Sequence, residues 1–373
     1  MSIAPGSTIG IVGGGQLGRM LAIAAAQLGY KCHIFDPHEH PCAADVAAKF
    51  TRASYDDRPA LQKFGAEVDV ATYEFENLPV DPLRALEGKL RPGVKSLSVA
   101  QDRAVEKEFI EHCGAAVASW SSVDSLADVE RAVAELGTPV VLKTRRYGYD
   151  GKGQAWVRDS SHCGAAWDAI GREPAVAETG IHFAAEFSVI VARWADGRKT
   201  FWDSPDNAHR EGILRTSTVP SSDTFAPQVD AARTAAAAIA DALGHVGVLT
   251  VEFFASGDGP VVNEIAPRVH NSGHWTIEGA FTSQFEQHIR AICDLPPGST
   301  ELAAASARMD NLIGDEIHDW ERLLGDPHAH VHVYGKGEAR PGRKMGHLCV
   351  LADSADEAFA RAQAIKARLA GGL

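Results

Sequence analysis

The sequence predicts a multidomain protein of mixed class, in which an N-terminal α/β unit precedes regions of α+β character. Its 373 residues exceed what one compact core usually holds, so two or three domains are expected. A β-branched run, a glycine turn, a helical stretch and a second apolar run occupy residues 8–36. Such a βαβ unit requires a parallel sheet with a right-handed crossover. Later, a Ser-Gly-Asp-Gly turn at residues 256–259 joins two strand-like runs, which is typical of an antiparallel hairpin.

Residues 1–100 are predicted to form the α/β domain. Strand patterns cover residues 8–12, 31–36 and 68–72. Helical patterns cover residues 17–28, ended by Gly29, and residues 81–86, opened by Asp81-Pro82. Glycine, proline and serine between residues 91 and 98 indicate a domain boundary.

The middle of the chain predicts a small α+β unit built on an antiparallel sheet. Its expected helices cover residues 102–113 and 125–136, and its expected strands cover residues 139–143, 154–157, 183–191 and 199–202. The remaining elements are a helix at 230–243, hairpin strands at 248–254 and 260–265, an amphipathic helix at 278–292, strands at 330–334 and 347–351, and a helix at 355–369.

Composition narrows the class of protein. The 36 Lys and Arg against 49 Asp and Glu give a formal charge of -13, which disfavours nucleic acid and anionic lipid as partners. No stretch approaches the roughly 18 apolar residues of a spanning helix, and the N-terminus lacks the pattern of a secretory signal. The six cysteines form no CxxC pair, so we expect free thiols, no structural zinc and a cytoplasmic location.

The first motif is a glycine turn, Gly13 to Gly18, which fits GxGxxG between a strand and a helix. Asp36 closes the following strand at about the interval of a dinucleotide-binding fingerprint. Amides and the helix dipole make this turn suitable for an anion. The pattern alone leaves three alternatives open, namely NAD or FAD, a phosphate-bearing substrate, and a purely structural tight turn.

A second motif places Lys143 at the end of a strand before the glycine-rich loop 148–153. It is not a Walker A loop, because neither a Lys-Ser or Lys-Thr pair nor a helix follows the last glycine. Such a loop between antiparallel strands can cover a triphosphate, with Lys143 as a point charge. The alternative is a flexible hairpin tip with a solvated lysine.

Two glutamates of the predicted hairpin, Glu252 and Glu264, are equidistant from Asp258 at its tip. A symmetric turn would place them opposite each other, about 5 Å apart, where like charges destabilise a sheet. A cation between them would reverse that effect, and oxygen ligands favour magnesium or manganese. Two hydrated carboxylates on a solvent-facing edge are the alternative.

Polar loops follow this hairpin. Residues 266–274 place Arg268, His270 and Asn271 together, which suits binding a small anion and stabilising developing charge, unless the loop merely satisfies its own hydrogen bonds. Residues 336–344 concentrate four basic side chains, which indicates a phosphate site or a solvated basic turn. The alternating His328, His330 and His332 are interpreted as packing rather than as metal ligands, and the tryptophans as core residues.

Taken together, these motifs resemble the ATP-grasp carboxylate–amine ligases. More narrowly, the chain is similar to the 5-(carboxyamino)imidazole ribonucleotide synthases of bacterial-type purine synthesis. The resemblance rests on residues 13–20, 73–77, 147–154, 212–216, 263–275 and 340–347, which spread over nearly the whole chain. The string from Asn263 to Trp275 is very specific.

This resemblance implies an ATP-grasp fold with three parts. They are a Rossmann-like pre-ATP-grasp domain (1–100), an ATP-grasp region (101–295) with a small lid subdomain at about 115–190, and a C-terminal part (296–373) that completes the active-site domain. The implied reaction joins 5-aminoimidazole ribonucleotide, bicarbonate and ATP, and a homodimer is expected. The glycine turn would then hold substrate rather than NAD.

The resemblance also assigns roles by position. The catalytic residues would be Asp150, which orients the amine and accepts its proton, and Arg268, His270 and Asn271, which bind bicarbonate and carboxyphosphate. ATP would be held by Arg103, Lys143, Gly148, Tyr149, Asp150, Gly151, Lys152, Gly153, Gln154, Glu178, Thr179, Gly180, Ile181, Glu186, His209, Asn263 and Glu264. The ribonucleotide would contact Gln16, Leu17, Glu76, Lys336, Arg343 and Lys344, and Glu252 and Glu264 would hold Mg²⁺ or Mn²⁺.

Other functions are weighed against this one. A sister ATP-grasp ligase would use formate on glycinamide ribonucleotide or would carboxylate biotin, but the loop from Arg268 to His274 favours the imidazole acceptor. An NAD-dependent oxidoreductase would leave the Glu252/Glu264 pair and the lysine–glycine loop unexplained. A nucleotide-sensing module would bind ATP without turnover.

Overall fold

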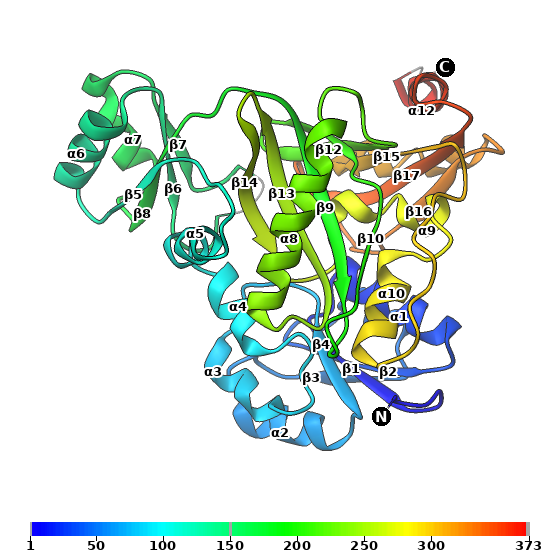
Figure 1. Cartoon of the computed structure of the whole chain (residues 1–373). Helices are drawn as coiled ribbons and strands as arrows, with labels where there is room; N and C mark the ends of the chain where they lie inside the picture. The colour runs from blue at the N-terminus through cyan, green and yellow to red at the C-terminus, as the bar shows by residue number, and fades with distance from the viewer. Residues whose placement is uncertain (1, 149–150, 371–373) are drawn as a thin grey trace.

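The computed structural model describes residues 2–148 and 151–370, the last three of these by their backbone alone. Within this part of the chain the strands form a four-stranded parallel sheet, a nine-stranded sheet and a four-stranded antiparallel sheet. Figure 1 shows the parallel sheet at the bottom, the antiparallel sheet at the upper left and the nine-stranded sheet between and to the right of them. We call the last two the small sheet and the large sheet.

The N-terminal domain is the predicted α/β unit, with strand order β3-β2-β1-β4 and parallel pairing throughout. Its elements are β1 (Thr8–Val12), α1 (Gln16–Gln27), β2 (Lys31–Asp36), β3 (Lys49–Arg52), α2 (Arg58–Ala66), β4 (Val70–Tyr73), α3 (Val80–Leu83) and α4 (Val94–Ala100). The predicted helix at 81–86 is an α-helical turn followed by the 3-10 turn Arg84–Leu86. Strand β3 escaped prediction because it is short and nowhere fully buried.

The small sheet has the order β5-β8-β6-β7. Helix α5 (Arg103–His112) leads into β5 (Trp120–Val123), α6 (Leu126–Leu136), β6 (Val140–Thr144), β7 (Gln154–Val157), α7 (Cys163–Ala169) and β8 (Ala175–Thr179). The predicted antiparallel α+β unit is thus present, but the assignment of residues 183–191 and 199–202 to it is wrong. Those strands belong to the large sheet, because the long β9 pairs along its whole length with β13.

The large sheet runs in the order β14-β13-β9-β11-β12-β15-β17-β16, and β10 pairs with β9. Its strands are β9 (Phe183–Arg193), β10 (Lys199–Phe201), β11 (Asp206–Arg210), β12 (Ile213–Val219), β13 (Gly247–Ser256), β14 (Gly259–Ala266), β15 (Ser306–Ile313), β16 (His330–Val333) and β17 (Lys344–Ala352). The helices of this part are α8 (Val229–Leu243), α9 (Thr276–Gly279), α10 (Gln284–Ile292), α11 (Trp320–Leu324) and α12 (Ala355–Ala370). The C-terminal strands therefore continue the sheet that carries the hairpin.

The single helix predicted at residues 278–292 is wrong, because the chain breaks between α9 and α10. Ala280 adopts an extended conformation and forms a β-bridge with Leu302. The side chain of Ser283 then accepts a hydrogen bond from the amide of Glu286 and starts a new helix. Helix α10 buries Phe285, Ile289 and Ile292, and the prediction extended the helical pattern of this segment back across Ala280.

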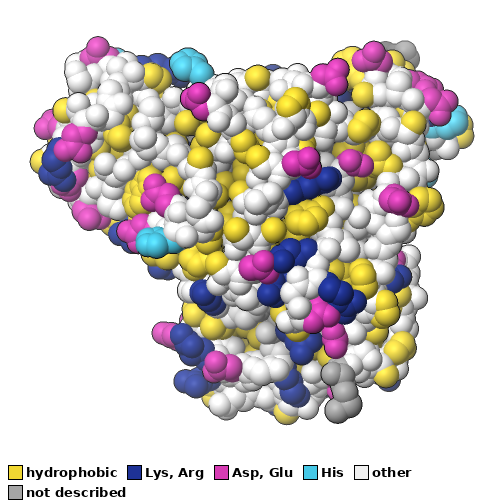
Figure 2. Space-filling view, in the orientation of Figure 1, with side chains coloured by type: hydrophobic (Ala, Val, Ile, Leu, Met, Phe, Trp, Pro, Cys, Tyr) yellow, Lys and Arg dark blue, Asp and Glu magenta, His cyan; other side chains and the backbone are white. Residues whose placement is uncertain are grey.

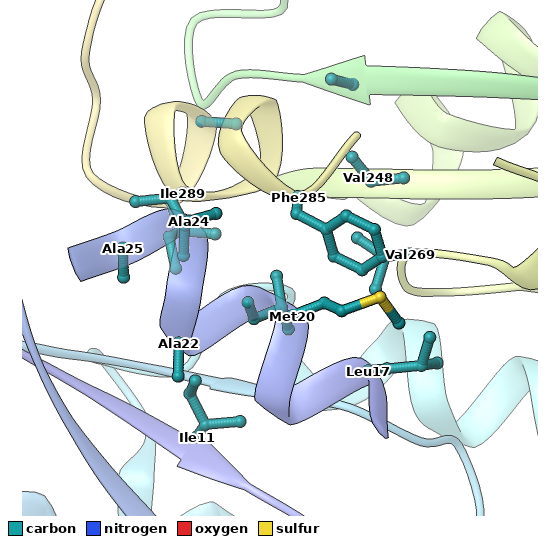
Figure 3. Packing of buried hydrophobic residues seen from close by; sticks show 14 of the residues in the cluster. Ile11, Leu17, Met20, Ala22, Ala24, Ala25, Val248, Val269, Phe285 and Ile289 are labelled. Atoms are coloured by element: carbon teal, nitrogen blue, oxygen red, sulfur yellow. The ribbon is translucent and has the colours of Figure 1, made fainter. Parts of the chain in front are cut away.

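Apolar packing joins the N-terminal domain to the large sheet. Figure 3 shows Met20 and Leu17 of α1 facing Phe285 of α10 and Val269, within one buried cluster. Two buried hydrogen bonds cross the same junction. Thr72 of β4 bonds His288 of α10 at 2.8 Å, and Ser96 of α4 bonds His245 at 3.0 Å.

The surface agrees with the acidic composition. On the face shown in Figure 2, acidic side chains lie among the basic ones, so this face carries no continuous basic surface. Among the described residues, none of the helices combines the length and the apolar character needed to span a bilayer.

The buried histidines of the domain junction predict a pH-dependent stability. Burial lowers the pKa of His288 to about 3 and that of His245 to about 4, so the folded protein keeps both rings neutral. Since an unfolded histidine protonates near pH 6.5, the free energy of unfolding should fall as the pH drops below that value. The loss should be about 1.4 kcal/mol per pH unit for each ring.

Urea unfolding between pH 7 and pH 5 measures this slope. His288→Gln should lower stability at pH 7 but make the slope shallower by one proton, whereas the exposed His328→Gln should leave the slope unchanged. An unchanged slope in His288→Gln would contradict the argument.

Candidate active site

One cavity of about 890 Å³ lies where the N-terminal domain, the small sheet and the large sheet meet. Every described residue of the predicted site lines it. They are Gln16, Leu17, Glu76, Arg103, Lys143, Gly148, Gly151, Lys152, Gly153, Gln154, Glu178, Thr179, Gly180, Ile181, Glu186, His209, Glu252, Asn263, Glu264, Arg268, His270, Asn271, Lys336, Arg343 and Lys344. Tyr149 and Asp150 lie outside the described residues. The fold therefore brings the predicted residues together, while the role of each stays a prediction.

The glycine turn has its amides occupied by the protein itself. Glu74 accepts hydrogen bonds from the Gly15 amide at 2.8 Å and the Gly18 amide at 3.1 Å. Asp36 accepts one from the Gly14 amide at 2.7 Å. A dinucleotide phosphate bound at this turn would need the same amide groups as hydrogen-bond donors. The geometry therefore disfavours the NAD interpretation of this motif.

Lys143 sits at the cavity wall, near the end of β6. Its Nζ donates to Glu178 Oε2 at 3.0 Å and to Asn263 Oδ1 at 3.1 Å. Burial opposes ionisation of Glu178, but Lys143 and Lys107 together hold the pKa of that carboxyl below its ordinary value. The wall thus presents an ammonium group held by neighbouring oxygens and directed at the cavity.

The glycine loop after β6 requires glycine at two described positions. Gly151 and Gly153 have φ values of 76° and 69°, in the left-handed region that other residues rarely adopt. A Cβ on Gly153 would also lie 2.4 Å from the Thr144 hydroxyl. The Gly153 carbonyl in turn accepts a hydrogen bond from the Thr144 amide at 2.8 Å, so Gly153 lies directly against the end of β6.

Glu252 and Glu264 are directly opposite each other, as predicted, but for a different reason. The turn pairs Ser256 with Gly259, and this register holds through Phe253 and Val262. A β-bulge at Asn263 then shifts the register by one residue and brings Glu264 opposite Glu252. A regular hairpin with this turn would have placed Asn263 there.

The electrostatics of this pair suit a cation. Burial, and then the charge of Glu264, raises the pKa of Glu252 to about 7. His270 Nε2 lies 3.1 Å from Glu252, and Arg103 Nη1 lies 3.0 Å from Glu264. A divalent ion would stabilise both ionised carboxylates, and their hard oxygens fit Mg²⁺ or Mn²⁺.

The polar loop after β14 is held from both sides. Arg268 is paired with Glu76 of the N-terminal domain. His270 Nδ1 bonds the Ser272 hydroxyl at 2.9 Å, and burial lowers the pKa of His270 well below its ordinary value. Asn271 and Asn311 exchange amide hydrogen bonds of 3.0 and 2.6 Å. The loop thus offers a cation, a neutral imidazole and an amide at one place.

The basic segment closes the other end of the cavity. Lys336 Nζ donates to the Lys344 carbonyl at 3.0 Å, and burial, with the charge of Arg343, lowers the pKa of Lys336 to about 8. Arg343 donates to the Glu338 carbonyl at 3.0 Å. Lys344 begins β17 instead of preceding the strand, because β17 starts three residues before the predicted boundary. These cations lie beside the same cavity as Gln16 and Leu17.

Some residues of the site were not predicted. Glu106 and Lys107 of α5 are 2% and 1% exposed, although charged residues on a helix usually indicate a solvated face. Glu106 lines the cavity and accepts the Ile265 amide at 2.7 Å. The sequence pattern could not reveal that these two residues are buried, because the elements that cover α5 come from distant parts of the chain.

The alternating histidines give a mixed outcome. His328 and His330 are exposed, so their interpretation as packing residues is wrong. His332 does pack: its ring stacks on His347 with centroids 4.4 Å apart and 10° between planes, and its Nε2 lies 2.6 Å from Glu278 Oε1.

Three family models cover most of the chain. The ribonucleotide synthetase preATP-grasp domain matches residues 6–101, the ATP-grasp domain matches residues 108–285, and the phosphoribosylaminoimidazole carboxylase C-terminal domain matches residues 307–361. The N5-carboxyaminoimidazole ribonucleotide synthase of Brucella melitensis is 47% identical, with 93% of this chain and 97% of that protein covered. The chain belongs to the N5-carboxyaminoimidazole ribonucleotide synthase family. It is an ATP-grasp ligase of that family, so the predicted fold, family and enzyme class are confirmed.

Further members of this synthase family are similar over nearly their whole length. The Bacillus subtilis enzyme is 42% identical, covering 95% of this chain and 94% of its own. The crystal structure of an ADP complex of a synthetase of this name has a TM-score of 0.92 and 41% identity, covering 98% and 97% of the two chains. The Aspergillus clavatus synthase in complex with ADP and 5-aminoimidazole ribonucleotide has a TM-score of 0.91 and 30% identity, covering 98% and 99%.

The internal capping of the glycine turn predicts the effect of removing Glu74. In Glu74→Ala, the Gly15 and Gly18 amides lose their acceptor inside the domain, so unfolding should become easier by about 2–4 kcal/mol. Denaturant titration measures the change. The exposed Glu39→Ala of the same domain should shift stability by less than about 0.5 kcal/mol. Equal effects of the two substitutions would refute the capping role.

Proposed function

We propose that this synthase joins 5-aminoimidazole ribonucleotide, bicarbonate and ATP into 5-(carboxyamino)imidazole ribonucleotide, ADP and phosphate in purine biosynthesis. The observation that carries the proposal is the cavity between the three parts of the chain. The cavity is lined by a lysine with its glycine loop, by two glutamates that face each other across a hairpin, by an Arg-His-Asn loop and by a basic segment. The relatives described as complexes with ADP, and with ADP and 5-aminoimidazole ribonucleotide, support both nucleotide substrates.

Lys143 and the carboxylate pair indicate which part of the cavity would bind ATP, which we call the nucleotide end. Lys143, Arg103 and the amides of residues 148–154 would hold the phosphates, and residues 178–181 would lie along the base, with Glu186 and His209 beside the ribose. Glu252 and Glu264 would hold Mg²⁺ or Mn²⁺, which would neutralise the charge that builds up during phosphoryl transfer. His209 Nδ1 lies 2.8 Å from Glu186 Oε2, and this pairing raises the pKa of the imidazole despite its burial.

The chemistry requires bicarbonate to be activated, because its leaving group would otherwise be hydroxide. Transfer of the γ-phosphoryl group to bicarbonate gives carboxyphosphate, whose leaving group is phosphate. Arg268, His270 and Asn271 would bind this anion, with the Arg268 guanidinium stabilising its charge. Carboxyphosphate then breaks down to carbon dioxide in the closed site, where the exocyclic amine of the ribonucleotide attacks it.

The acceptor end follows from the basic segment. Lys336, Arg343 and Lys344 would bind the ribose phosphate, and Gln16, Leu17 and Glu76 would line the same part of the cavity. Asp150 of the glycine loop is proposed to orient the amine and to accept its proton. Water must be excluded because carboxyphosphate hydrolyses, which gives a covering loop a purpose. We further propose a cytoplasmic homodimer.

Phosphate release from MgATP and bicarbonate, with and without 5-aminoimidazole ribonucleotide, tests this function. The wild type should show release that the ribonucleotide strongly stimulates. Glu264→Gln should lose at least about a hundredfold of the stimulated rate, since one ligand of the cation is gone. Glu321→Gln, exposed on α11, should behave as the wild type.

Each deviation identifies a different error. Bound ATP without stimulation by the ribonucleotide would contradict the acceptor, and glycinamide ribonucleotide would be tried next. Full stimulation in Glu264→Gln would contradict the metal site.

The lowered pKa of Lys336 predicts how kcat/KM for the ribonucleotide falls at alkaline pH. Because this pKa is about 8, the free enzyme loses the ammonium charge as the pH rises through that value. The kcat/KM for 5-aminoimidazole ribonucleotide should therefore fall by up to about tenfold per pH unit above pH 8. Lys336→Arg keeps its charge and should flatten this limb, even if its maximum is lower. An identical limb in both proteins would show that Lys336 does not cause it.

A further inference from the structure

Helix α5 lies between the small sheet and the β13–β14 hairpin and contacts both. On the hairpin side, Arg103 donates to Glu264 at 3.0 Å and Glu106 accepts the Ile265 amide at 2.7 Å. These two contacts fix the strand that carries Glu264. Asp102 and Lys107 belong to the same helical turns, one residue before Arg103 and one after Glu106.

These two residues at the start of α5 reach the walls of the nucleotide end. Asp102, the N-cap of α5, accepts two hydrogen bonds from the Arg145 guanidinium at 2.9 and 2.8 Å. Lys107 Nζ lies 3.2 Å from Glu178 Oε2 on β8. The start of α5 therefore ties the carboxylate hairpin and the strands around Lys143 into one frame.

Two ammonium groups lie within ion-pair distance of the same oxygen of Glu178. Lys143 Nζ is 3.0 Å and Lys107 Nζ is 3.2 Å from the same Oε2. The two lysines differ in access, because the Lys143 side chain is 13% exposed and lines the cavity, whereas that of Lys107 is 1% exposed. Only Lys143 can therefore turn toward a molecule in the cavity, while Lys107 stays with Glu178.

We propose that Lys107 is a positioning residue: it supplies Glu178 with a second counter-charge, so that Lys143 can leave this carboxylate for the polyphosphate of the bound nucleotide. This inference rests on the nucleotide site proposed above. A buried carboxylate with a single cation holds that cation strongly, because separating them leaves an uncompensated buried charge. With Lys107 in place, Glu178 stays paired when Lys143 moves.

The inference predicts that removing the charge of Lys107 weakens the binding of ligands that carry phosphates and not of ligands that lack them. In Lys107→Met, which keeps the length of the side chain without its charge, Lys143 becomes the sole cation of Glu178. The dissociation constant for ATP, measured by calorimetry without acceptor, should rise by about tenfold to a hundredfold. That for adenosine, which has no phosphate, should change by less than about threefold. A general distortion of the pocket would weaken the binding of both ligands by similar factors.

Glu178→Gln provides the second route. Removing the negative charge frees Lys143 from its partner, so Lys107→Met/Glu178→Gln should regain the preference of the wild type for ATP over adenosine. Glu178→Gln alone should keep that preference, and it carries the test if Lys107→Met does not fold, as judged by thermal melting. Lys63→Met, exposed on α2, is the matched control and should bind both ligands as the wild type does.

The outcomes separate this inference from the site on which it rests. Unchanged ATP affinity in Lys107→Met, an equal loss for ATP and adenosine, or a tenfold loss of the ATP preference in Glu178→Gln would each overturn the role of Lys107. Lys143→Met identifies the other failure. If it binds ATP as tightly as the wild type, the proposed nucleotide site is wrong. If it loses the ATP preference while Lys107→Met keeps it, only the further inference is wrong.

Discussion

The opposition of Glu252 and Glu264 is the constraint on which the site depends. Two carboxylates directly across a hairpin repel each other, and burial raises the pKa of Glu252 further. The fold tolerates this pair by placing Arg103 against one member and His270 against the other. These contacts come from α5 and from the loop after β14. The two carboxylates that make the hairpin suitable for a cation therefore also hold α5 and this loop in place.

The large sheet connects the carboxylate pair to the basic segment. The loop after β14 reaches the N-terminal domain through the pairing of Arg268 with Glu76, and it reaches β15 through Asn271 and Asn311. Strand β15 pairs with β17, whose first residue is Lys344. One continuous sheet thus sets the spacing between the carboxylate pair and the basic segment, and a ligand that spans the cavity contacts residues from distant parts of the chain.

Local sequence patterns predicted the structural features that depend on neighbouring residues. They failed for features that depend on contacts between distant parts of the chain. Strands β1, β2 and β7 have their predicted bounds, because each is a short apolar or alternating run. Strand β9 looked like part of the nearby small sheet, but its partner β13 lies far along the chain. The opposition of Glu252 and Glu264 was predicted from an assumed symmetric turn, whereas a bulge at Asn263 produces it. Lys107 gave no signal, since its burial depends on what covers α5.

The glycine turn shows how a correct local pattern can suggest the wrong ligand. Its strand, turn and helix satisfy the geometry of a dinucleotide fingerprint, and Asp36 ends the second strand as the pattern requires. The side chain of Asp36, however, turns back to the Gly14 amide, and Glu74 from β4's end takes two more amides. The anion that such a turn favours is supplied by the protein itself. A Cβ on Gly15 would lie 2.5 Å from a Glu74 oxygen, so glycine is needed there for an internal carboxylate. The same sequence pattern therefore serves to fix the part of the cavity wall formed by Gln16 and Leu17.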